Sequence, residues 1–292
     1  MNTEAISDEY ADLDAWPTGR ILEELLRSNA RAVKAVQAVL PQLERAAELL
    51  RGRLENGGRL IYAGAGTSGR LALQDAAELP PTFGFSDTVV LMAGGSDAGT
   101  RALEGAEDDA AAARRAVGEA GVGPNDALIG LAASGNTPYT VAAVSRAREL
   151  GAATIGVANN PGSRLLAAAE VPLLLDTGPE VLAGSTRLAA GTAQKIVLNA
   201  LSTTVLVQLG GAWSNLMVGM QTSNEKLRGR ATGIVAAATG LDAAAAAAAL
   251  EASGADMRVA IVSVKAGVSA AEARRALDSA GNSVRRALGL LG

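Results

Sequence analysis

Residues 60–69 read Leu-Ile-Tyr-Ala-Gly-Ala-Gly-Thr-Ser-Gly, a short apolar run that ends in a glycine-rich loop. A run as short as Leu60–Ala63 predicts a buried β-strand, and a helical pattern begins behind the loop. Four further runs have the same form, and most are followed by Gly, Ser or Asn and then by a helical pattern: Val89–Ala93, Ala127–Ala132, Thr154–Val157 and Val171–Leu175. Buried runs that alternate with helices are typical of βαβ units. The sequence therefore predicts an α/β fold with a doubly wound, five-stranded parallel sheet.

The segments on either side of this pattern are expected to be mostly helical. Residues 1–17 predict an irregular arm, and residues 18–56 carry helical apolar spacing that Pro41 divides or bends. Residues 184–209 predict one long, largely buried helix, with Ser185 as its N-cap.

An internal repeat marks the C-terminal part of the chain. Two segments that begin Gly240-Leu-Asp-Ala-Ala and Gly267-Val-Ser-Ala-Ala lie 27 residues apart, and Asp242 and Ser269 stand where helix N-caps belong. The repeat predicts short paired helices. The expected organisation is an N-terminal arm with helices at 1–56, a sheet domain at 57–235 and a small helical subdomain at 236–292.

The composition limits the chemistry, because the chain contains no cysteine and no histidine. This excludes disulfides and thiolate sites, and it removes the commonest general base and metal ligand. Acid–base chemistry must then use Glu, Asp, Lys or Tyr. The formal net charge of −4 argues against nucleic acid as a partner. The N-terminus lacks signal-peptide features and no run of roughly 20 apolar residues occurs, so we expect a cytoplasmic protein without a membrane partner.

The loop Gly64–Gly69 matches the pattern GxGxxG, which is typical of dinucleotide-binding proteins. We discount that interpretation, because the acidic residue expected about 20 residues later, at the end of the next strand, is missing. Asp87 precedes that strand and Asp97 follows it. The hydroxyls of Thr67 and Ser68 suit a phosphate or a sugar hydroxyl better. The alternative is a tight strand-to-helix turn that binds nothing.

A second polar loop, Ala133-Ser-Gly-Asn-Thr137, follows the third predicted strand. It places Ser134, Asn136 and Thr137 at a helix N-terminus, where free backbone amides and the helix dipole favour a phosphate. The alternative is that Ser134 or Thr137 only caps the helix. Two hydroxyl-rich glycine loops at the mouths of two strands of one sheet predict a ligand site more strongly than one loop does.

Candidate carboxylates follow the first two predicted strands. Glu78 lies near the end of the first helix of the sheet domain, just before Pro80-Pro81. Glu104, Glu107 and Asp108 are expected on the helix after the second strand. Composition alone favours a solvated surface position for all four, since acidic side chains are mostly exposed.

Motifs distributed along the chain carry a family resemblance. They are Ile61-Tyr-Ala-Gly-Ala-Gly-Thr-Ser-Gly-Arg-Leu71, Asp75-Ala-Ala-Glu-Leu-Pro-Pro-Thr-Phe-Gly84, Glu104-Gly-Ala-Glu-Asp108, Ala133-Ser-Gly-Asn-Thr-Pro-Tyr139, Gly178-Pro-Glu-Val181, Gly184-Ser-Thr-Arg-Leu188, Gly191-Thr-Ala-Gln-Lys195, Asn215-Leu-Met217 and Asn224-Glu-Lys-Leu227. From about Thr3 to the C-terminus the chain resembles the N-acetylmuramic acid 6-phosphate etherases. The glucokinase regulatory protein is a related, non-catalytic branch with a similar sugar-phosphate pocket.

The resemblance implies a sugar isomerase (SIS) fold, a homodimer, and no metal or organic cofactor. It also implies a reaction on a small sugar phosphate. Lactate is eliminated from C3 of the open-chain N-acetylmuramic acid 6-phosphate, and water then adds to the unsaturated aldehyde. The implied products are N-acetylglucosamine 6-phosphate and D-lactate, and the implied setting is the recovery of cell-wall amino sugar.

The family's two glutamates fall on Glu78 and Glu107. Two carboxyls in different environments can divide acid and base roles in a chain without histidine. We expect Glu78 to protonate the departing lactate oxygen and later to activate water, with Glu107 as its acid–base partner. The residues expected to bind the substrate are Gly66, Thr67, Ser68, Gly69, Ser134, Gly135, Asn136, Thr137, Ser185 and Arg187.

The spacing of Ser68 and Glu78 raises a geometric problem. Ten helical residues separate them, which is roughly 15 Å along the axis at 1.5 Å per residue. One sugar phosphate does not easily reach both ends. Either the helix breaks early, or Glu78 serves a site whose phosphate lies elsewhere, for which we expect the other subunit of a dimer.

The sequence also departs from the family pattern. The Arg-Asn pair usual after Thr3-Glu4-Ala5 is missing, Asn136 stands where arginine is usual, Ala189 replaces a lysine and Gly219 an aspartate. These losses of charge leave a weakly catalytic sugar-phosphate sensor as an alternative, whereas Glu78 and Glu107 favour the enzyme. A third alternative is an aldose–ketose phosphate isomerase on the same fold, since one fold hosts many functions.

Overall fold

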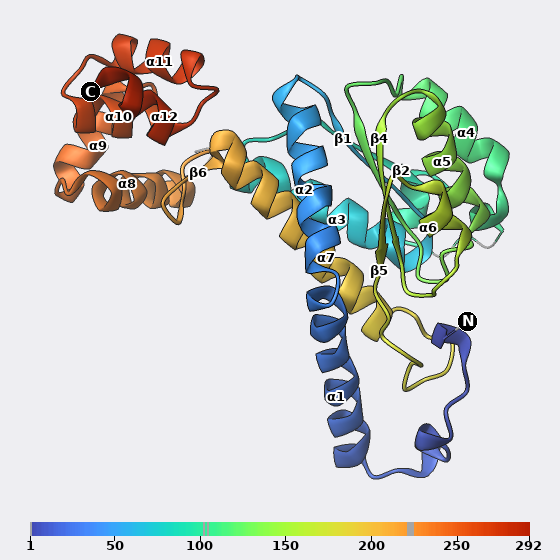
Figure 1. Cartoon of the computed structure of the whole chain (residues 1–292). Helices are drawn as coiled ribbons and strands as arrows, with labels where there is room; N and C mark the ends of the chain where they lie inside the picture. Colours follow the sequence, from blue (N-terminus) through green and yellow to red (C-terminus); the bar gives the residue numbers. More distant parts are fainter. Residues whose placement is uncertain (1, 102, 104, 221–224) are drawn as a thin grey trace. The chain divides into compact units, whose positions relative to one another are not determined.

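The computed structural model describes residues 2–101, 103, 105–220 and 225–292, and the chain forms two compact units (Figure 1). The first unit contains the chain up to Ala77 together with Asp87–Ser202. The second contains Glu78–Ser86 and Thr203–Gly292.

The first unit is built on a five-stranded sheet. Its strands are β1 (Leu60–Gly64), β2 (Thr88–Met92), β3 (Ala127–Leu131), β4 (Ala153–Ala158) and β5 (Val171–Leu174). They are hydrogen-bonded in the order β2-β1-β3-β4-β5, and every pair is parallel. All five strands predicted from the sequence are confirmed, and so is the parallel, doubly wound α/β class.

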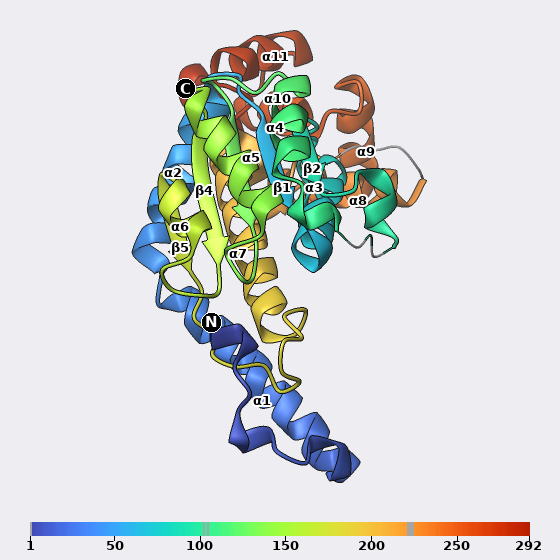
Figure 2. The same ribbon diagram turned by 90° about the vertical axis from the view of Figure 1, so that its right-hand side faces the viewer.

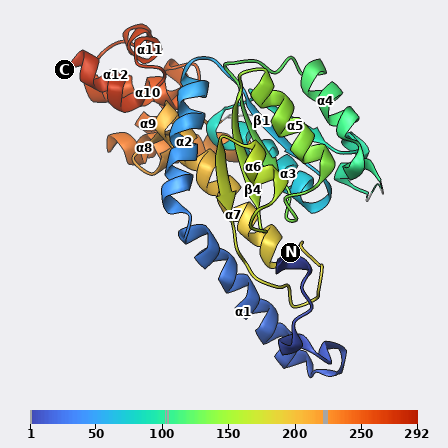
Figure 3. The same ribbon diagram turned by 45° about the vertical axis from the view of Figure 1, so that its right-hand side comes forward.

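Helices cover both faces of this sheet (Figure 3). One face carries α2 (Leu40–Glu55) and the first-unit parts of α3 (Gly66–Phe83) and α7 (Ala189–Leu206), and the other carries α4 (Ala110–Glu119), α5 (Pro138–Glu149) and α6 (Arg164–Ala168). Strands covered on both sides have no solvent face, which explains why β1, β3 and β4 are buried along their whole length.

The strand order places a switch point between β1 and β3. The chain leaves β1 towards β2 on one side, whereas it leaves β3 towards β4 on the other. Gly64 at the end of β1 pairs with Leu131 at the end of β3, so the loops behind these strands start side by side. In open α/β sheets, ligands bind in the crevice that forms where neighbouring loops diverge in this way.

The N-terminal arm is more ordered than the sequence predicted. It contains three 3-10 turns, η1 (Asn2–Glu4), η2 (Asp8–Tyr10) and η3 (Leu13–Ala15), before α1 (Thr18–Gln37). Buried Thr3 fixes its start: its N–H donates to Asn160 Oδ1 (3.2 Å), and Asn160 Nδ2 donates to Thr3 Oγ1 (2.8 Å). Asn160 follows β4, so the arm begins beside the carboxyl ends of the strands (Figure 2).

The start of the long helix was predicted wrongly. α7 begins at Ala189, not at Gly184, and Ser185 is not its N-cap. The buried carboxylate of Glu180 takes that role, because it accepts hydrogen bonds from the amides of Ala189 and Ala190, each 2.9 Å long. A carboxylate is favoured there by the free amides and the helix dipole. The helical turns end beyond α7 in a π turn, Val207–Gly211.

The second unit contains short helices around their own apolar core. Its elements after α7 are β6 (Ala212–Trp213), β7 (Leu216–Met217), α8 (Glu225–Thr239), α9 (Ala243–Ala252), α10 (Met257–Ala266), α11 (Ala270–Ser279) and α12 (Val284–Leu291). The predicted paired helices are confirmed as α9–α10 and α11–α12. Asp242 caps α9, and Ser269 caps α11 within a capping box that Glu272 completes.

Within the described ranges, no individual helix combines the length and apolar character required to cross a bilayer. Only α8 and α9 taken together meet those criteria, and they are bent by 105° where they join. Buried residues from both, among them Ile234 and Leu250, belong to the core of the second unit.

Candidate active site

A pocket of about 230 Å³ opens at the switch point between β1 and β3. The two glycine loops predicted to bind a ligand form most of its wall. Its lining residues are Glu4, Ala65, Gly66, Thr67, Ser68, Glu107, Ala132, Ala133, Ser134, Thr137 and Thr186. Five hydroxyl side chains and two carboxylates therefore face one space, and every lining residue belongs to the first unit.

The β1 side of the pocket is the first turn of α3. Because α3 begins at Gly66, the amides of Gly66, Thr67 and Ser68 belong to that turn and have no carbonyl of a preceding turn to bind. Such amides, together with the positive end of the helix dipole, favour an anion. The buried hydroxyl of Ser68 donates to Gln194 Oε1 (2.7 Å), and Gln194 Nε2 donates to Asn159 Oδ1 (3.1 Å). This chain of bonds holds Ser68 in place from α7.

The β3 side of the pocket is the turn before α5. Ser134 Oγ accepts the amide of Asn136 (3.1 Å) and lies 3.5 Å from Thr137 Oγ1. Thr137 occupies the N-cap position, yet its side chain makes no capping bond. Gly135 has a positive φ of 68°, and a Cβ there would lie 2.2 Å from Ser163 Oγ, so the turn requires glycine. The alternative in which Thr137 merely caps the helix is therefore not what the structure shows.

Asn136 stabilises this loop by hydrogen bonds and is not among the described residues that line the pocket. Its Nδ2 donates to Ser134 O (3.3 Å), and its Oδ1 accepts the amide of Arg164 at the start of α6 (3.1 Å). The amide side chain therefore joins two loops at the carboxyl edge of the sheet. A hydrogen-bonding asparagine suits that position in place of the usual arginine.

Glu107 lines the pocket, but not from a helix after β2 as predicted. It lies on the 3-10 turn η5 (Ala106–Asp108), and α4 begins only at Ala110, where Asp109 caps it by accepting the amide of Ala112 (2.8 Å). The N-cap sets the helix start later than acidic composition suggested. Glu104 lies outside the described residues.

Glu78 is not among the described residues that line this pocket. It is an exposed residue near the end of α3, and it belongs to the second unit, whereas the described lining of the pocket belongs to the first. α3 runs without a break from Gly66 to Phe83, so the helix does not end early. Pro80 and Pro81 follow Glu78 inside the helix, where each removes one backbone donor. The structure thus shows no early break that would bring Glu78 back towards Ser68.

Sequence reasoning missed two polar lining residues, Glu4 and Thr186, besides the three alanines Ala65, Ala132 and Ala133. Glu4 reaches the pocket because Thr3 is anchored to Asn160, and its Oε2 lies 3.1 Å from where a Cβ on Gly184 would be. An arm read as irregular gave no reason to expect this, although Thr3-Glu4 began the family motif. Thr186 is the neighbour of the predicted Ser185.

The remaining predicted ligands do not line this pocket in the described part of the chain. They are Gly69, Gly135, Asn136, Ser185 and Arg187. Gly69 and Gly135 shape the two turns by close packing, since a Cβ on Gly69 would lie 3.0 Å from Gly64 O. Arg187 is exposed on the segment before α7. Their substrate contacts stay predictions.

A buried carboxylate supports the site from behind. Asp75 on α3 accepts hydrogen bonds from Tyr62 Oη on β1 (2.8 Å), Asn199 Nδ2 on α7 (2.8 Å) and Ser202 Oγ (3.3 Å). Burial raises the pKa of Tyr62 well above its ordinary value, and the nearby carboxylate of Asp75 adds to this effect. Tyr62 therefore stays a neutral donor. The three contacts fix the helix that begins at the pocket.

The chain is similar to known proteins over most of its length. The family model of the SIS domain matches residues 26–159. The N-acetylmuramic acid 6-phosphate etherase of Deinococcus radiodurans is 51% identical over 262 residues, which cover 89% of this chain and 86% of that protein. The chain belongs to the N-acetylmuramic acid 6-phosphate etherase family. The family member of Symbiobacterium thermophilum is 50% identical over 263 residues, or 89% of this chain and 87% of that protein.

A solved structure outside the etherase family shares the fold. A phosphoheptose isomerase from Francisella tularensis matches with a TM-score of 0.52 and 19% identity, covering 66% of this chain and 100% of that chain. At this level of identity the similarity concerns the SIS-type fold alone.

Two departures from the etherase family pattern have a structural setting. A Cβ on Gly219 would lie 2.3 Å from the carbonyl oxygen of Phe83, so the backbone here leaves no room for an aspartate. Ala189 is buried, and its amide is bound by Glu180, so a lysine there would bring its charge close to the same carboxylate.

Proposed function

We propose that this protein releases D-lactate from N-acetylmuramic acid 6-phosphate and leaves N-acetylglucosamine 6-phosphate, in the recovery of cell-wall amino sugar. The observation that carries the proposal is the position of Glu107, in one pocket with the hydroxyls and first-turn amides of two helices. The amides and hydroxyls suit a phosphate. Glu107 supplies the acid–base group that a chain without histidine needs. The etherases of the family support the same substrate.

The reaction needs one base and one acid. In the open-chain sugar the proton on C2 is acidified by the aldehyde at C1. A base removes it, the electron pair forms the C2–C3 double bond, and the C3–O bond breaks as the lactate oxygen takes a proton from an acid. Water then adds its oxygen to C3 and a proton to C2, which restores the saturated sugar. Neither step requires an oxidant or a reductant.

We assign Glu78 as the acid that protonates lactate and later activates water, and Glu107 as its partner. Glu78 lies ten residues beyond Ser68, about 15 Å along a continuous helix, so one phosphate does not easily reach both in one chain. Its exposure supports a site shared across a cytoplasmic homodimer, in which Glu78 of one subunit serves the pocket of the other.

Lactate release from N-acetylmuramic acid 6-phosphate tests the activity. We expect Glu107→Gln and Glu78→Gln each to lower kcat/KM by about 10³-fold, the usual effect of losing a general acid or base. Glu48→Gln, an exposed glutamate on α2, is the matched control and should retain full activity. If the folded wild type binds N-acetylglucosamine 6-phosphate but releases no lactate, the etherase proposal fails and the sensor alternative replaces it.

Mixing the two inactive variants tests the shared site. After subunit exchange, half of the dimers should contain one intact site out of two, so about a quarter of wild-type activity should return. Exchange itself is verified with differently tagged subunits. Verified mixed dimers without activity would show that both glutamates act within one chain.

A further inference from the structure

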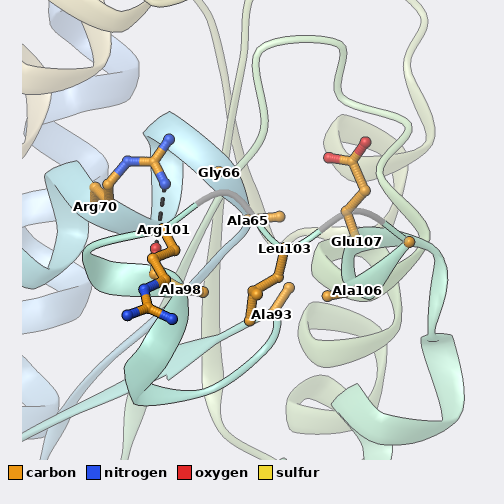
Figure 4. Close-up of a pocket in the computed structure, with 10 residues that line it drawn as sticks. Ala65, Gly66, Arg70, Ala93, Ala98, Arg101, Leu103, Ala106 and Glu107 are labelled. Atoms are coloured by element: carbon orange, nitrogen blue, oxygen red, sulfur yellow. Dashed lines mark hydrogen bonds between the residues drawn. The ribbon is translucent and has the colours of Figure 1, made fainter.

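A second hollow of about 210 Å³, drawn in Figure 4, shares part of its lining with the hydroxyl-lined pocket. The two share Ala65, Gly66 and Glu107, so the candidate acid–base lies where they meet. The side chains that distinguish the second hollow are those of Arg70, Arg101 and Leu103. Figure 4 shows both arginines on one side of it and Glu107 on the other.

Among the described residues, neither arginine forms an ion pair with a carboxylate. Arg70, one residue beyond the glycine loop, donates from Nη1 to Ala98 O (3.2 Å) and has other N–H groups left. Arg101 is exposed just beyond the 3-10 turn η4 (Ser96–Gly99). In the described ranges, neither guanidinium lies within 4.0 Å of a carboxylate oxygen, whereas Arg59 and Arg114 both form such ion pairs.

Two guanidiniums on one wall, neither of them paired with a carboxylate of the described residues, suit a carboxylate ligand. Guanidinium presents a planar set of donors that matches both oxygens of a carboxylate, and it stays charged. The rest of the wall is small or apolar, with Leu103 and Ala93 beside the arginines. The hollow therefore offers charge for a carboxylate and apolar surface for a small alkyl group.

We infer that Arg70 and Arg101 form the subsite for the lactyl carboxylate of the substrate, which rests on the proposed function. The order of groups in the substrate is phosphate, sugar chain, ether oxygen and then the lactyl methyl and carboxylate. The order of groups in the protein is the same: hydroxyls and helix amides, then Glu107, then Leu103 and the arginines. The scissile ether bond thus falls beside Glu107, between two anion subsites.

The subsite selects the free acid. A lactyl group whose carboxylate is blocked as an amide carries no charge for the arginines, so the enzyme should discriminate against it. Wild type should cleave N-acetylmuramic acid 6-phosphate with a kcat/KM about 30-fold above that of its lactyl-carboxamide analogue, the range of one charge-assisted hydrogen-bonding contact.

The test measures both substrates with Arg101→Gln and Arg70→Gln. Each variant should lose most of the 30-fold preference by losing turnover of the acid, with the carboxamide nearly unchanged. Arg115→Gln, an exposed arginine on α4 outside the hollow, is the matched control and should keep the preference. Thermal melting accompanies Arg70→Gln because Arg70 also binds Ala98 O, whereas exposed Arg101 provides a variant free of that concern.

Binding of N-acetylglucosamine 6-phosphate, which has the phosphate but no carboxylate, separates the outcomes. It should be unaffected in Arg101→Gln. Equal weakening of this compound and of the substrate would show that the arginines bind the phosphate and would overturn the inference. If the wild type releases no lactate, the proposed function is wrong, but the subsite can still be tested by binding. The wild type should then bind N-acetylmuramic acid 6-phosphate more tightly than N-acetylglucosamine 6-phosphate, and Arg101→Gln should abolish this difference. A difference that persists in Arg101→Gln would overturn the subsite.

Discussion

The amino and carboxyl edges of the parallel sheet differ in whether their charged side chains form ion pairs. Before β1 and β3, Arg59 donates from Nε and Nη2 to both oxygens of Asp126 (3.1 and 2.8 Å), which also accepts the amides of Arg59 and Gly123. At the carboxyl edge, behind β1 and β2, Glu107 and Arg101 line a hollow with no ion pair among its described residues. The amino end uses charge to hold the sheet together, whereas the carboxyl end keeps charge available for a ligand.

The pKa of Asp126 is lowered by the contacts at the amino edge. Burial by itself raises the pKa, but the hydrogen bonds from the Arg59 side chain and from the two amides outweigh it. The net result is a pKa below the ordinary value of 3.8. A carboxyl whose pKa is lowered by folding stabilises the folded state wherever it is ionised.

The largest effect on stability should come from removing this pair. Asp126→Ala leaves Arg59 and two amides at the sheet edge without their acceptor, so we expect about 3 kcal/mol less free energy of unfolding. Activity per folded molecule should be unchanged, because the site lies at the other end of the strands. Urea unfolding with a parallel lactate assay checks both, and a large loss of kcat/KM in the folded variant would break the contrast between the ends.

The same pair predicts a pH dependence. Since the folded pKa of Asp126 is lower than the unfolded one, its contribution is complete above the unfolded value near 3.8 and disappears as pH falls through the folded pKa. The stability difference between wild type and Asp126→Ala should therefore be constant from about pH 7 to 5 and shrink below about pH 4. Urea unfolding across this range measures it, and a difference that grows on acidification would have the wrong sign.

A smaller, purely functional effect is expected at the carboxyl end. Thr67→Val removes a pocket hydroxyl but keeps the shape of the side chain, so affinity for N-acetylglucosamine 6-phosphate should fall about tenfold. Stability should stay within about 0.5 kcal/mol of wild type. Calorimetric titration and thermal melting check the two halves. Thr232→Val on α8, in the second unit, is the control that should leave affinity unchanged.

The smallest expected effect concerns the arm that brings Glu4 to the pocket. Thr3→Val removes the acceptor for Asn160 Nδ2, so the arm should be held less tightly by about 1 kcal/mol. Faster proteolytic cleavage within residues 1–17 and a modest rise in KM should follow, with global unfolding nearly unaffected. Loss of global stability instead would show that the arm is part of the core rather than a cover for the site.

The elements that the sequence predicted well are those with strong local signals. Five apolar runs gave the five strands, and Asp242 and Ser269 marked true helix starts. The two errors both concern helix starts. α7 begins at Ala189 because Glu180, nine residues earlier, caps it, and a cap supplied from that distance leaves no local pattern. α4 begins at Ala110 because the adjacent Asp109 caps it, and the acidic run Glu107–Asp109 does not by itself show which of its members is the cap.

The candidate site was predicted only in part, because the sequence shows local contacts and not distant ones. Thr67, Ser68, Ser134 and Thr137 follow two strands directly, so parallel pairing alone brings them together. Arg70 follows the first of these loops directly, whereas Glu4 and Arg101 join the site through a long-range anchor at Asn160 and a turn, which no spacing in the chain encodes.

By itself, the sequence determined the fold class and the position of the two glycine loops that line the pocket, because buried runs and glycines act locally, and the absence of histidine limits the acid–base groups by exclusion. Only the tertiary structure decided which charged side chains form stabilising ion pairs and which remain available to a ligand. Arg59 and Arg101 are the same residue type, and their difference lies in what the fold places within hydrogen-bond distance. Pairing of that kind depends on separations of a few ångströms between segments far apart in the chain, which the order of residues does not state.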